Sequence, residues 1–320
     1  MHFRFSRGAR DVLAHSFLLI CTFVTATLAG VYWNNKDPLE LEYFSNGLPY
    51  AVLLIVFLSS HELGHYITAR INGVSASYPY FIPFPSFLGL NPFGTMGAVI
   101  RLRSAVPSTK ALFDIGAAGP ISGFIVSAVF LVVGFRTLPS IHFLYEMHPE
   151  YATMASIPEG GLRFGSNLVY SLLASTIPSP GSFVPPMNEI YHYPFLCVGW
   201  FGLFVTAMNL IPVGQLDGGH IALAVLGRRA GFVGRVSIAI LSILGVAGLL
   251  PLLGVDIRWG WSGWLLWAIL LLVFARRMRT GADQFHEEPQ LDALRKTIAL
   301  ACLVILIGSF APSPISFDPS

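Results

Sequence analysis

Two histidines four residues apart, with a glutamate between them, form the motif His61-Glu62-Leu63-Gly64-His65. In an α-helix, positions i and i+4 share a face, so both imidazoles could bind one metal ion. A glutamate beside such an ion can take a proton from a metal-bound water, which is the chemistry of zinc-dependent peptide hydrolysis. The motif is short, and a catalytic zinc site needs a third protein ligand.

The motif lies inside an apolar segment that begins near Gly47 and ends near Arg70. Of the 320 residues, 54% are hydrophobic and 11% are charged, against about 25% charged in an ordinary soluble domain. Ionisable groups inside a membrane are costly and usually mark a functional site. The composition therefore predicts a metal site at membrane depth. A net charge of +2 gives no reason to expect nucleic acid as a partner.

Apolar segments of membrane-spanning length recur along the chain. The fold class that we predict is an all-α polytopic membrane protein with about seven transmembrane helices. The predicted spans cover residues 17–33, 47–70, 112–135, 195–212, 233–254, 259–275 and 297–310. Most Lys and Arg residues then lie on the side of the amino terminus, which we expect to be cytoplasmic. A signal peptide cut near Ala29 is the alternative for the first span; we favour an uncleaved span.

Three parts are expected along the chain. They are residues 1–45, with a basic amino-terminal arm, the first span and an outer loop; residues 46–230, the catalytic membrane core; and residues 231–320, with additional spans and a tail.

The segment between residues 74 and 107 is apolar yet rich in proline and glycine, which prevents a continuous helix. Irregular backbone at membrane depth persists only where protein or a water-filled cavity covers it. Residues 98–104 alternate apolar and polar side chains as a strand does. We therefore expect a re-entrant β-like hairpin near the metal site. Gly97 and Val99 on it could bind an extended substrate by strand pairing.

Asp217 is the best candidate for the third metal ligand. It follows the predicted span 195–212, at a depth comparable with that of His61. Pro212 and the glycines near it break the helix there and could turn a carboxylate inward. The alternative is a loop aspartate that caps a helix starting near Gly218.

Two motifs together resemble a known family. The first is His61-Glu-Leu-Gly-His65, and the second is Asn209-Leu-Ile-Pro-Val-Gly-Gln-Leu-Asp-Gly218. The pair resembles the signature of the site-2 protease family of zinc intramembrane metalloproteases. Gly94-Thr-Met-Gly-Ala-Val-Ile-Arg-Leu-Arg103 and Gly116-Ala-Ala-Gly-Pro-Ile-Ser-Gly123 resemble the family's intervening segment, so the likeness covers residues 46–230. No peptide-binding (PDZ) module separates the motifs, as in the compact bacterial and chloroplast members.

The resemblance implies a function and a set of roles. His61, His65 and Asp217 would hold one Zn²⁺ ion. Glu62 would activate a zinc-bound water, and Asn209 would contact substrate or the developing oxyanion. The enzyme would hydrolyse a peptide bond in or near the transmembrane segment of a membrane-protein substrate. We expect a multi-pass protein of a bacterial cell membrane, with an organellar membrane as the alternative. The sequence does not predict an oligomeric state.

Two other classes of protein compete with this interpretation. A metal transporter could use the same ligands, but it should show repeated half-structures and more ligands along a path. An inactive relative could serve as a binding or chaperone module, but the intact Glu62 argues against that. Replacing Glu62 by glutamine separates the three classes, because a protease alone would lose its function while keeping its metal.

Other ionisable residues receive structural interpretations. His142, His148 and His192 lie in the predicted outer loop, residues 136–194, without ligand spacing, and we interpret them as surface residues. Asp114, near the start of the third predicted span, is interpreted as a helix-end carboxylate.

Overall fold

A computed structural model describes four parts of the chain, residues 7–85, 93–255, 259–277 and 291–318. The predicted amino-terminal arm, hairpin segment and carboxyl-terminal part each include residues outside these ranges.

The described residues are mostly helical. The α-helices are α1 (Arg7–Trp33), α2 (Phe44–Ile71), α3 (Thr109–Arg136), α4 (His142–Met147), α5 (Leu168–Thr176), α6 (Pro194–Leu210), α7 (Asp217–Leu226), α8 (Ala230–Ala247), α9 (Gly263–Arg277) and α10 (Ala293–Ser309). Short 3₁₀ helices are η1 (Leu41–Tyr43), η3 (Pro149–Thr153), η4 (Ile190–His192), η5 (Gly227–Arg229) and η6 (Leu250–Leu253). The strands are β1 (Tyr80–Pro83), β2 (Thr95–Val99), β3 (Gly161–Phe164) and β4 (Ile315–Asp318).

Each of the seven predicted spans coincides with one helix, namely α1, α2, α3, α6, α8, α9 and α10. In the described part of the chain, four stretches are long and apolar enough to cross a membrane: Asp11–Trp33, Leu41–Ile71, Thr109–Arg136 and Asp217–Leu253. The mostly helical class is thereby confirmed, with four candidate membrane-spanning helices in the described part of the chain. Seven crossings stay a prediction, because α6 and α9 are apolar but shorter and α10 is not among the candidate spans.

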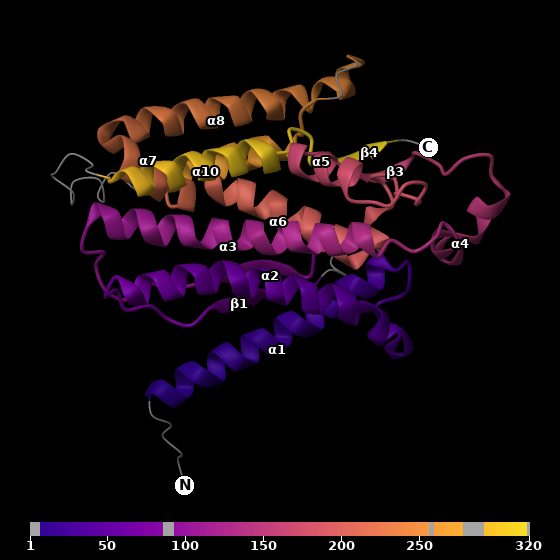
Figure 1. Ribbon diagram of the computed structural model, residues 1–320, viewed down its shortest axis with the longest axis horizontal. Coiled ribbons are helices and arrows are strands. Elements are labelled where there is room, and N and C mark those ends of the chain that lie inside the picture. Colours follow the sequence, from indigo (N-terminus) through magenta and orange to yellow (C-terminus); the bar gives the residue numbers. More distant parts are fainter. Residues whose placement is uncertain (1–6, 86–92, 256–258, 278–290, 319–320) are drawn as a thin grey trace, which may run out of the picture.

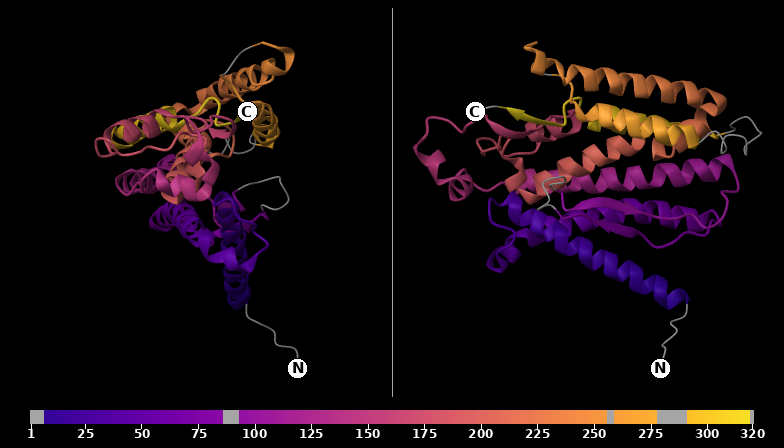
Figure 2. Two further views of the ribbon diagram at one scale, coloured as in Figure 1. Left: turned by 90° about the vertical axis from the view of Figure 1, so that its right-hand side faces the viewer. Right: turned by 180° about the vertical axis from the view of Figure 1, so that it is seen from behind.

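The helices form a layered bundle with α3 near its middle (Figure 1). Helices α1 and α2 lie on one side of α3, whereas α6, α10 and α8 lie on the other, and the view from behind shows the same order (Figure 2). α3 makes its most extensive contacts with α2 and α6. Glycine permits this approach: a Cβ added at Gly202 of α6 would meet the side chains of Ser127 on α3 and Phe57 on α2.

A bidentate ion pair joins α3 to α10. Arg295 donates from Nε to Oδ1 of Asp114 over 2.8 Å and from an Nη atom to Oδ2 over 2.6 Å. Asp114 lies in the second turn of α3, as expected for a helix-end carboxylate, and about a fifth of its side chain is exposed. Its partner, Arg295, is 181 residues away in sequence, so no local sequence pattern could predict the ion pair.

The predicted hairpin contains two short strands. β1 and β2 pair antiparallel, with Tyr80 opposite Val99 and Phe81 opposite Ala98. β2 begins at Thr95, whereas the sequence predicted a strand over residues 98–104, and β2 ends at Val99. Beyond Val99 the pairing continues only as an isolated bridge between Ala76 and Leu102. The β-like character is therefore present, with the strand placed earlier than predicted. Re-entry into a membrane stays a prediction.

Candidate metal site

His61, His65 and Asp217 meet at one point, which we call the inner cluster. The two Nε2 atoms lie 3.2 Å apart. Oδ2 of Asp217 lies 3.4 Å from Nε2 of His61 and 3.3 Å from Nε2 of His65. Both histidines are buried and Asp217 is half-buried. The structure thus brings together the three residues that the sequence named as metal ligands.

The spacing of these three atoms can be compared with the geometry of zinc. Ligand atoms about 2.0–2.1 Å from a tetrahedral ion lie about 3.3 Å from one another. The three distances in the inner cluster are 3.2, 3.3 and 3.4 Å. Two imidazoles and a carboxylate also form a donor set typical of catalytic zinc, with a fourth position left for water or substrate. The residues present therefore fit the ion that the sequence predicts.

Helix α2 supplies both imidazoles, and α3 orients one of them. Nδ1 of His65 donates to the carbonyl of Ile115 on α3 over 2.7 Å, which leaves the lone pair of Nε2 toward Asp217. Such a hydrogen bond on the outer nitrogen fixes the tautomer and the orientation of a metal-binding histidine. Nδ1 of His61 is buried and has no hydrogen-bond partner among the described residues.

Glycines of α3 form the wall behind the two imidazoles. A Cβ added at Gly119 would overlap the ring of His65, with Nε2 as the nearest atom. A Cβ added at Gly123 would lie 3.0 Å from Nδ1 of His61. The sequence predicted that small residues here allow helices to approach closely. It did not predict that the imidazoles themselves fill the space.

The turn between α6 and α7 brings Asp217 to the site. Asp217 is the first residue of α7, and a Cβ added at Gly218 would overlap the backbone of Leu210 at the end of α6. Glycine is therefore required for α7 to turn back against α6. The N-cap of α7 is Leu216, with no side-chain capping bond. The alternative role of Asp217, that of a helix cap, thus has no support in the geometry.

Two further predicted residues lie beside the inner cluster. Nδ2 of Asn209, near the end of α6, lies 3.2 Å from Nε2 of His61. Glu62 is buried, with 7% of its surface exposed, and its carboxylate lies near the backbone N–H of Ile100, just after β2. The end of the hairpin therefore approaches the glutamate. Gly97 lies on β2 with φ of +98°, and its N–H is already bonded to Oγ1 of Thr95.

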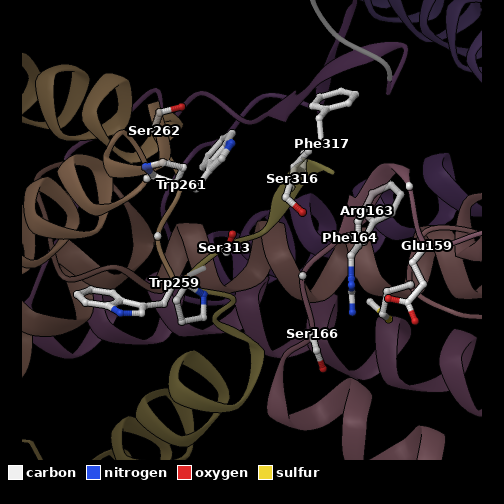
Figure 3. A pocket seen from close by; sticks show the side chains of 18 of the residues that line it. Glu159, Arg163, Phe164, Ser166, Trp259, Trp261, Ser262, Ser313, Ser316 and Phe317 are labelled. Carbon is white, nitrogen blue, oxygen red and sulfur yellow. The ribbon is translucent and has the colours of Figure 1, made fainter. Parts of the chain in front are cut away.

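A large hollow in the described part of the chain lies elsewhere. It has a volume of about 1290 Å³ and contains none of the predicted site residues. Figure 3 shows Trp259 and Trp261 on one side of it and Glu159 and Arg163 on the other. The hollow holds no group of metal ligands or nucleophile and base, so the inner cluster remains the candidate site.

One interpretation from the sequence is wrong. His142 is exposed, as expected for a surface residue, but only 1% of His192 is exposed, and His148 has 15% of its side chain exposed. Their Nε2 atoms lie 3.0 Å apart, because folding brings two loop segments together that are 44 residues apart in sequence. No spacing rule applies to such a pair, so it could not be predicted from the sequence.

Comparisons with known proteins identify the family. The profile of peptidase family M50 matches residues 49–252. The chain belongs to this family, which is the site-2 protease family that the paired motifs resemble. No solved structure shows a significant match to the chain.

Curated plant proteins are similar to the chain. "Probable zinc metalloprotease EGY2, chloroplastic" of Oryza sativa subsp. indica is 27% identical over 283 residues, which are 88% of this chain and 45% of that protein. The Arabidopsis thaliana protein of the same name is 28% identical over 268 residues, 82% of this chain and 42% of that protein. "Probable zinc metalloprotease EGY1, chloroplastic" of Oryza sativa subsp. japonica is 32% identical over 211 residues, 66% of this chain and 33% of that protein.

The chain spans less than half the length of these relatives. Their names agree with the predicted class of enzyme, a zinc metalloprotease, and with the predicted Zn²⁺ cofactor. The names also place these relatives in chloroplasts, which gives no support to the predicted bacterial cell membrane.

Proposed function

We propose that this chain is a membrane-embedded zinc endopeptidase that cuts a membrane-protein substrate in or near its transmembrane segment. The observation that carries the proposal is the convergence of two Nε2 atoms and one carboxylate oxygen at the spacing of zinc ligands, within apolar helices. Membership of a peptidase family supports the same reaction class. Because the site lies within apolar helices, a protein with a transmembrane segment is the substrate class that we propose.

His61, His65 and Asp217 would hold the zinc ion, which would supply a water of lowered pKa and a Lewis acid for the scissile carbonyl. Glu62 accepts the proton of the attacking water and returns it to the leaving amine. The amide of Asn209 lies beside Nε2 of His61, where it can donate to the oxygen on which negative charge develops.

The hairpin positions the substrate as an extended strand. The backbone N–H of Arg103 donates to the carbonyl of Ser75 over 2.7 Å, and the carbonyl of Arg101 accepts from the backbone N–H of Ser77 over 2.9 Å. The peptide groups of Arg101 and Arg103 therefore face the β1 side of the hairpin. Peptide groups alternate in direction along a strand, so Ile100 faces the opposite edge, where Glu62 lies. A peptide from an unwound helix can pair along that edge and pass over the metal site. Gly97 and Val99 belong to β2, which holds this edge in place for the substrate.

In this proposal the chain is a multi-pass membrane protein whose amino terminus lies on the side that carries most of the Lys and Arg residues. Residues 46–230 form the catalytic core, and residues 231–320 flank it with additional spans. The chloroplast location of the named relatives makes an organellar membrane the better-supported setting.

The decisive experiment is the variant Glu62→Gln of the purified chain in detergent, with a single-span membrane protein as substrate. We expect zinc content to stay unchanged and cleavage to fall by about 10²–10⁴-fold, the usual contribution of a general base. Glu40→Gln is the matched control, because Glu40 is an exposed carboxylate outside the site. Unchanged cleavage in Glu62→Gln would contradict the proposal.

Substrates can be found in cells that carry either the native chain or the Glu62→Gln variant. Single-span proteins that accumulate at full length only with the variant are the expected substrates. If the native chain is shown to cleave and yet no membrane protein differs between the two cell types, the proposed substrate class is wrong.

A further inference from the structure

We propose that His148, Glu189 and His192 form a second metal site, the outer cluster, that binds a divalent cation of the zinc class. The two Nε2 atoms lie 3.0 Å apart. Oε2 of Glu189 lies 3.4 Å from Nε2 of His192 and 3.7 Å from Nε2 of His148. These are the same three ligand types as in the inner cluster, at nearly the same spacing.

The hydrogen bonds of the two imidazoles leave both Nε2 atoms as acceptors. Nδ1 of His192 donates to the carbonyl of Trp33 over 2.6 Å, and Nδ1 of His148 donates to Oε1 of Glu150 over 3.2 Å. A neutral imidazole has one N–H group, so each Nε2 carries a lone pair. With these tautomers, two lone pairs and a carboxylate point at one another, an arrangement that a cation between them would stabilise.

Glu189 provides an independent observation. Only 1% of Glu189 is exposed. Its Oε1 accepts from the hydroxyl of Tyr151 and from the amide of Asn188, each over 3.1 Å. Its Oε2, which faces the imidazoles, is buried without a hydrogen-bond partner among the described residues. A buried ionised carboxylate is costly unless it is paired or binds a metal, and the cluster offers the metal position.

The ligand chemistry selects the class of ion. Imidazole nitrogen with carboxylate oxygen suits zinc and similar transition metals, whereas Ca²⁺ and Mg²⁺ prefer ligands that are all oxygen. The carbonyl and carboxylate that hold the two Nδ1 atoms are the usual outer partners of metal-binding histidines. The rings are also packed against tyrosines: Tyr151 stacks on His148 with centroids 4.6 Å apart, and Tyr191 contacts His192 at 4.2 Å.

The position of the outer cluster indicates what the ion does. His148 follows α4, Glu189 and His192 immediately precede α6, and the bond to Trp33 adds the end of α1. Figure 1 shows α4 at the end of the bundle opposite to α7, whose first residue belongs to the inner cluster. An ion here would fasten the outer loop to the ends of two helices, which is a structural role.

The alternative is a proton in place of the metal, shared between the two imidazoles and balanced by Glu189. Zinc counting separates the two. The full chain, purified in detergent, is stripped with a chelator, equilibrated with Zn²⁺, and analysed for metal by mass spectrometry. We expect two zinc ions per chain in the native protein, one in His148→Ala, and two in the control His142→Ala. One ion in both the native protein and His148→Ala would overturn the proposal.

A second variant keeps the test valid if His148→Ala fails to fold. The double variant His61→Ala with His65→Ala removes the inner ligands and leaves the outer cluster intact. We expect it to bind one zinc ion, which a hundredfold excess of Mg²⁺ or Ca²⁺ does not displace. No bound zinc in a folded double variant would overturn the second site, and displacement by Ca²⁺ would overturn the assigned class of ion. Neither result bears on proteolysis, which the Glu62→Gln experiment tests.

Discussion

The inner and outer clusters contain the same donor atoms, two imidazole Nε2 atoms and one carboxylate oxygen, yet they differ in how the chain builds them. In the inner cluster both histidines lie on α2, and the carboxylate begins α7. In the outer cluster the three residues lie in loop or 3₁₀ segments between α3 and α6. The inner cluster is thus held by packed helices, whereas the outer cluster itself holds irregular backbone in place.

Their surroundings suit different tasks. The inner imidazoles lie against glycines of α3, with Glu62 and the end of the hairpin beside them, which are the groups that the proposed peptidase requires. The outer imidazoles lie between tyrosine rings, and no described glutamate outside the ligand set faces their Nε2 atoms. The comparison assigns catalysis to the inner cluster and fastening of the loop to the outer one.

Two metal sites in one membrane protein also raise the question of transport. The clusters flank α6, whose 17 residues measure roughly 25 Å at 1.5 Å per residue. Between them, residues 44–60 of α2, 116–135 of α3 and 194–210 of α6 contain no histidine, aspartate or glutamate. An ion would have no carboxylate or imidazole to pass to in these three helices. The structure therefore favours two separate sites over a conduction path.

The variant Gly119→Ala should have the largest effect, and that effect should be confined to the inner cluster. The added Cβ would overlap the ring of His65 at Nε2, so the imidazole must move away from Asp217. We expect loss of the inner zinc and of all measurable cleavage, with the outer zinc retained. Metal analysis together with a cleavage assay measures both. Gly231→Ala is the matched control, because a Cβ there has no atom closer than 3.9 Å. Normal zinc content in Gly119→Ala would refute the proposed glycine wall.

The sequence predicted the inner cluster because its information is local. A helix places residues four apart on one face, so His61 and His65 needed no tertiary knowledge. Asp217 was proposed from its depth after the span 195–212 and from the helix-breaking residues before it, and the second motif with the family resemblance supported it. The outer cluster has neither helical spacing nor a recognised motif, because His148 and His192 meet only after the loop folds back onto the end of α1.

The same distinction applies to the fold. Helices followed from long apolar segments, and each predicted span coincides with a helix. The pairing of β3 with β4 and the ion pair between Asp114 and Arg295 join segments more than 150 residues apart. Short strands and single charges give no periodic signal over such separations, so these contacts could not be predicted.

Asn209→Ala should have an intermediate effect, which lowers the rate of cleavage and leaves metal binding unchanged. The amide lies 3.2 Å from Nε2 of His61 but is not one of the predicted ligands. Loss of one donor to a developing oxyanion typically costs about 10²–10³ in kcat. We therefore expect that loss in kcat, a nearly unchanged KM and two bound zinc ions. Steady-state kinetics with metal analysis measure this, with the exposed Asn46→Ala as control. A loss under about threefold would remove Asn209 from the catalytic groups.

Glu150→Gln should have the smallest effect and should be confined to the outer cluster. The pKa of Glu150 is lowered, first by its own backbone N–H and then by His148, so its carboxylate is ionised at neutral pH and accepts from Nδ1. Loss of such an outer partner weakens metal binding by about 10–100-fold. Because Glu150 is exposed and an amide oxygen can still accept from Nδ1, we expect the lower end of that range, and cleavage should stay unchanged. Zinc titration of the His61→Ala, His65→Ala protein with and without this change measures it, with Glu146→Gln on α4 as control. Equal zinc affinities in the two proteins would mean that His148 is oriented by its packing against Tyr151 and not by Glu150, whereas His192, like His65 of the inner cluster, is oriented by a backbone carbonyl.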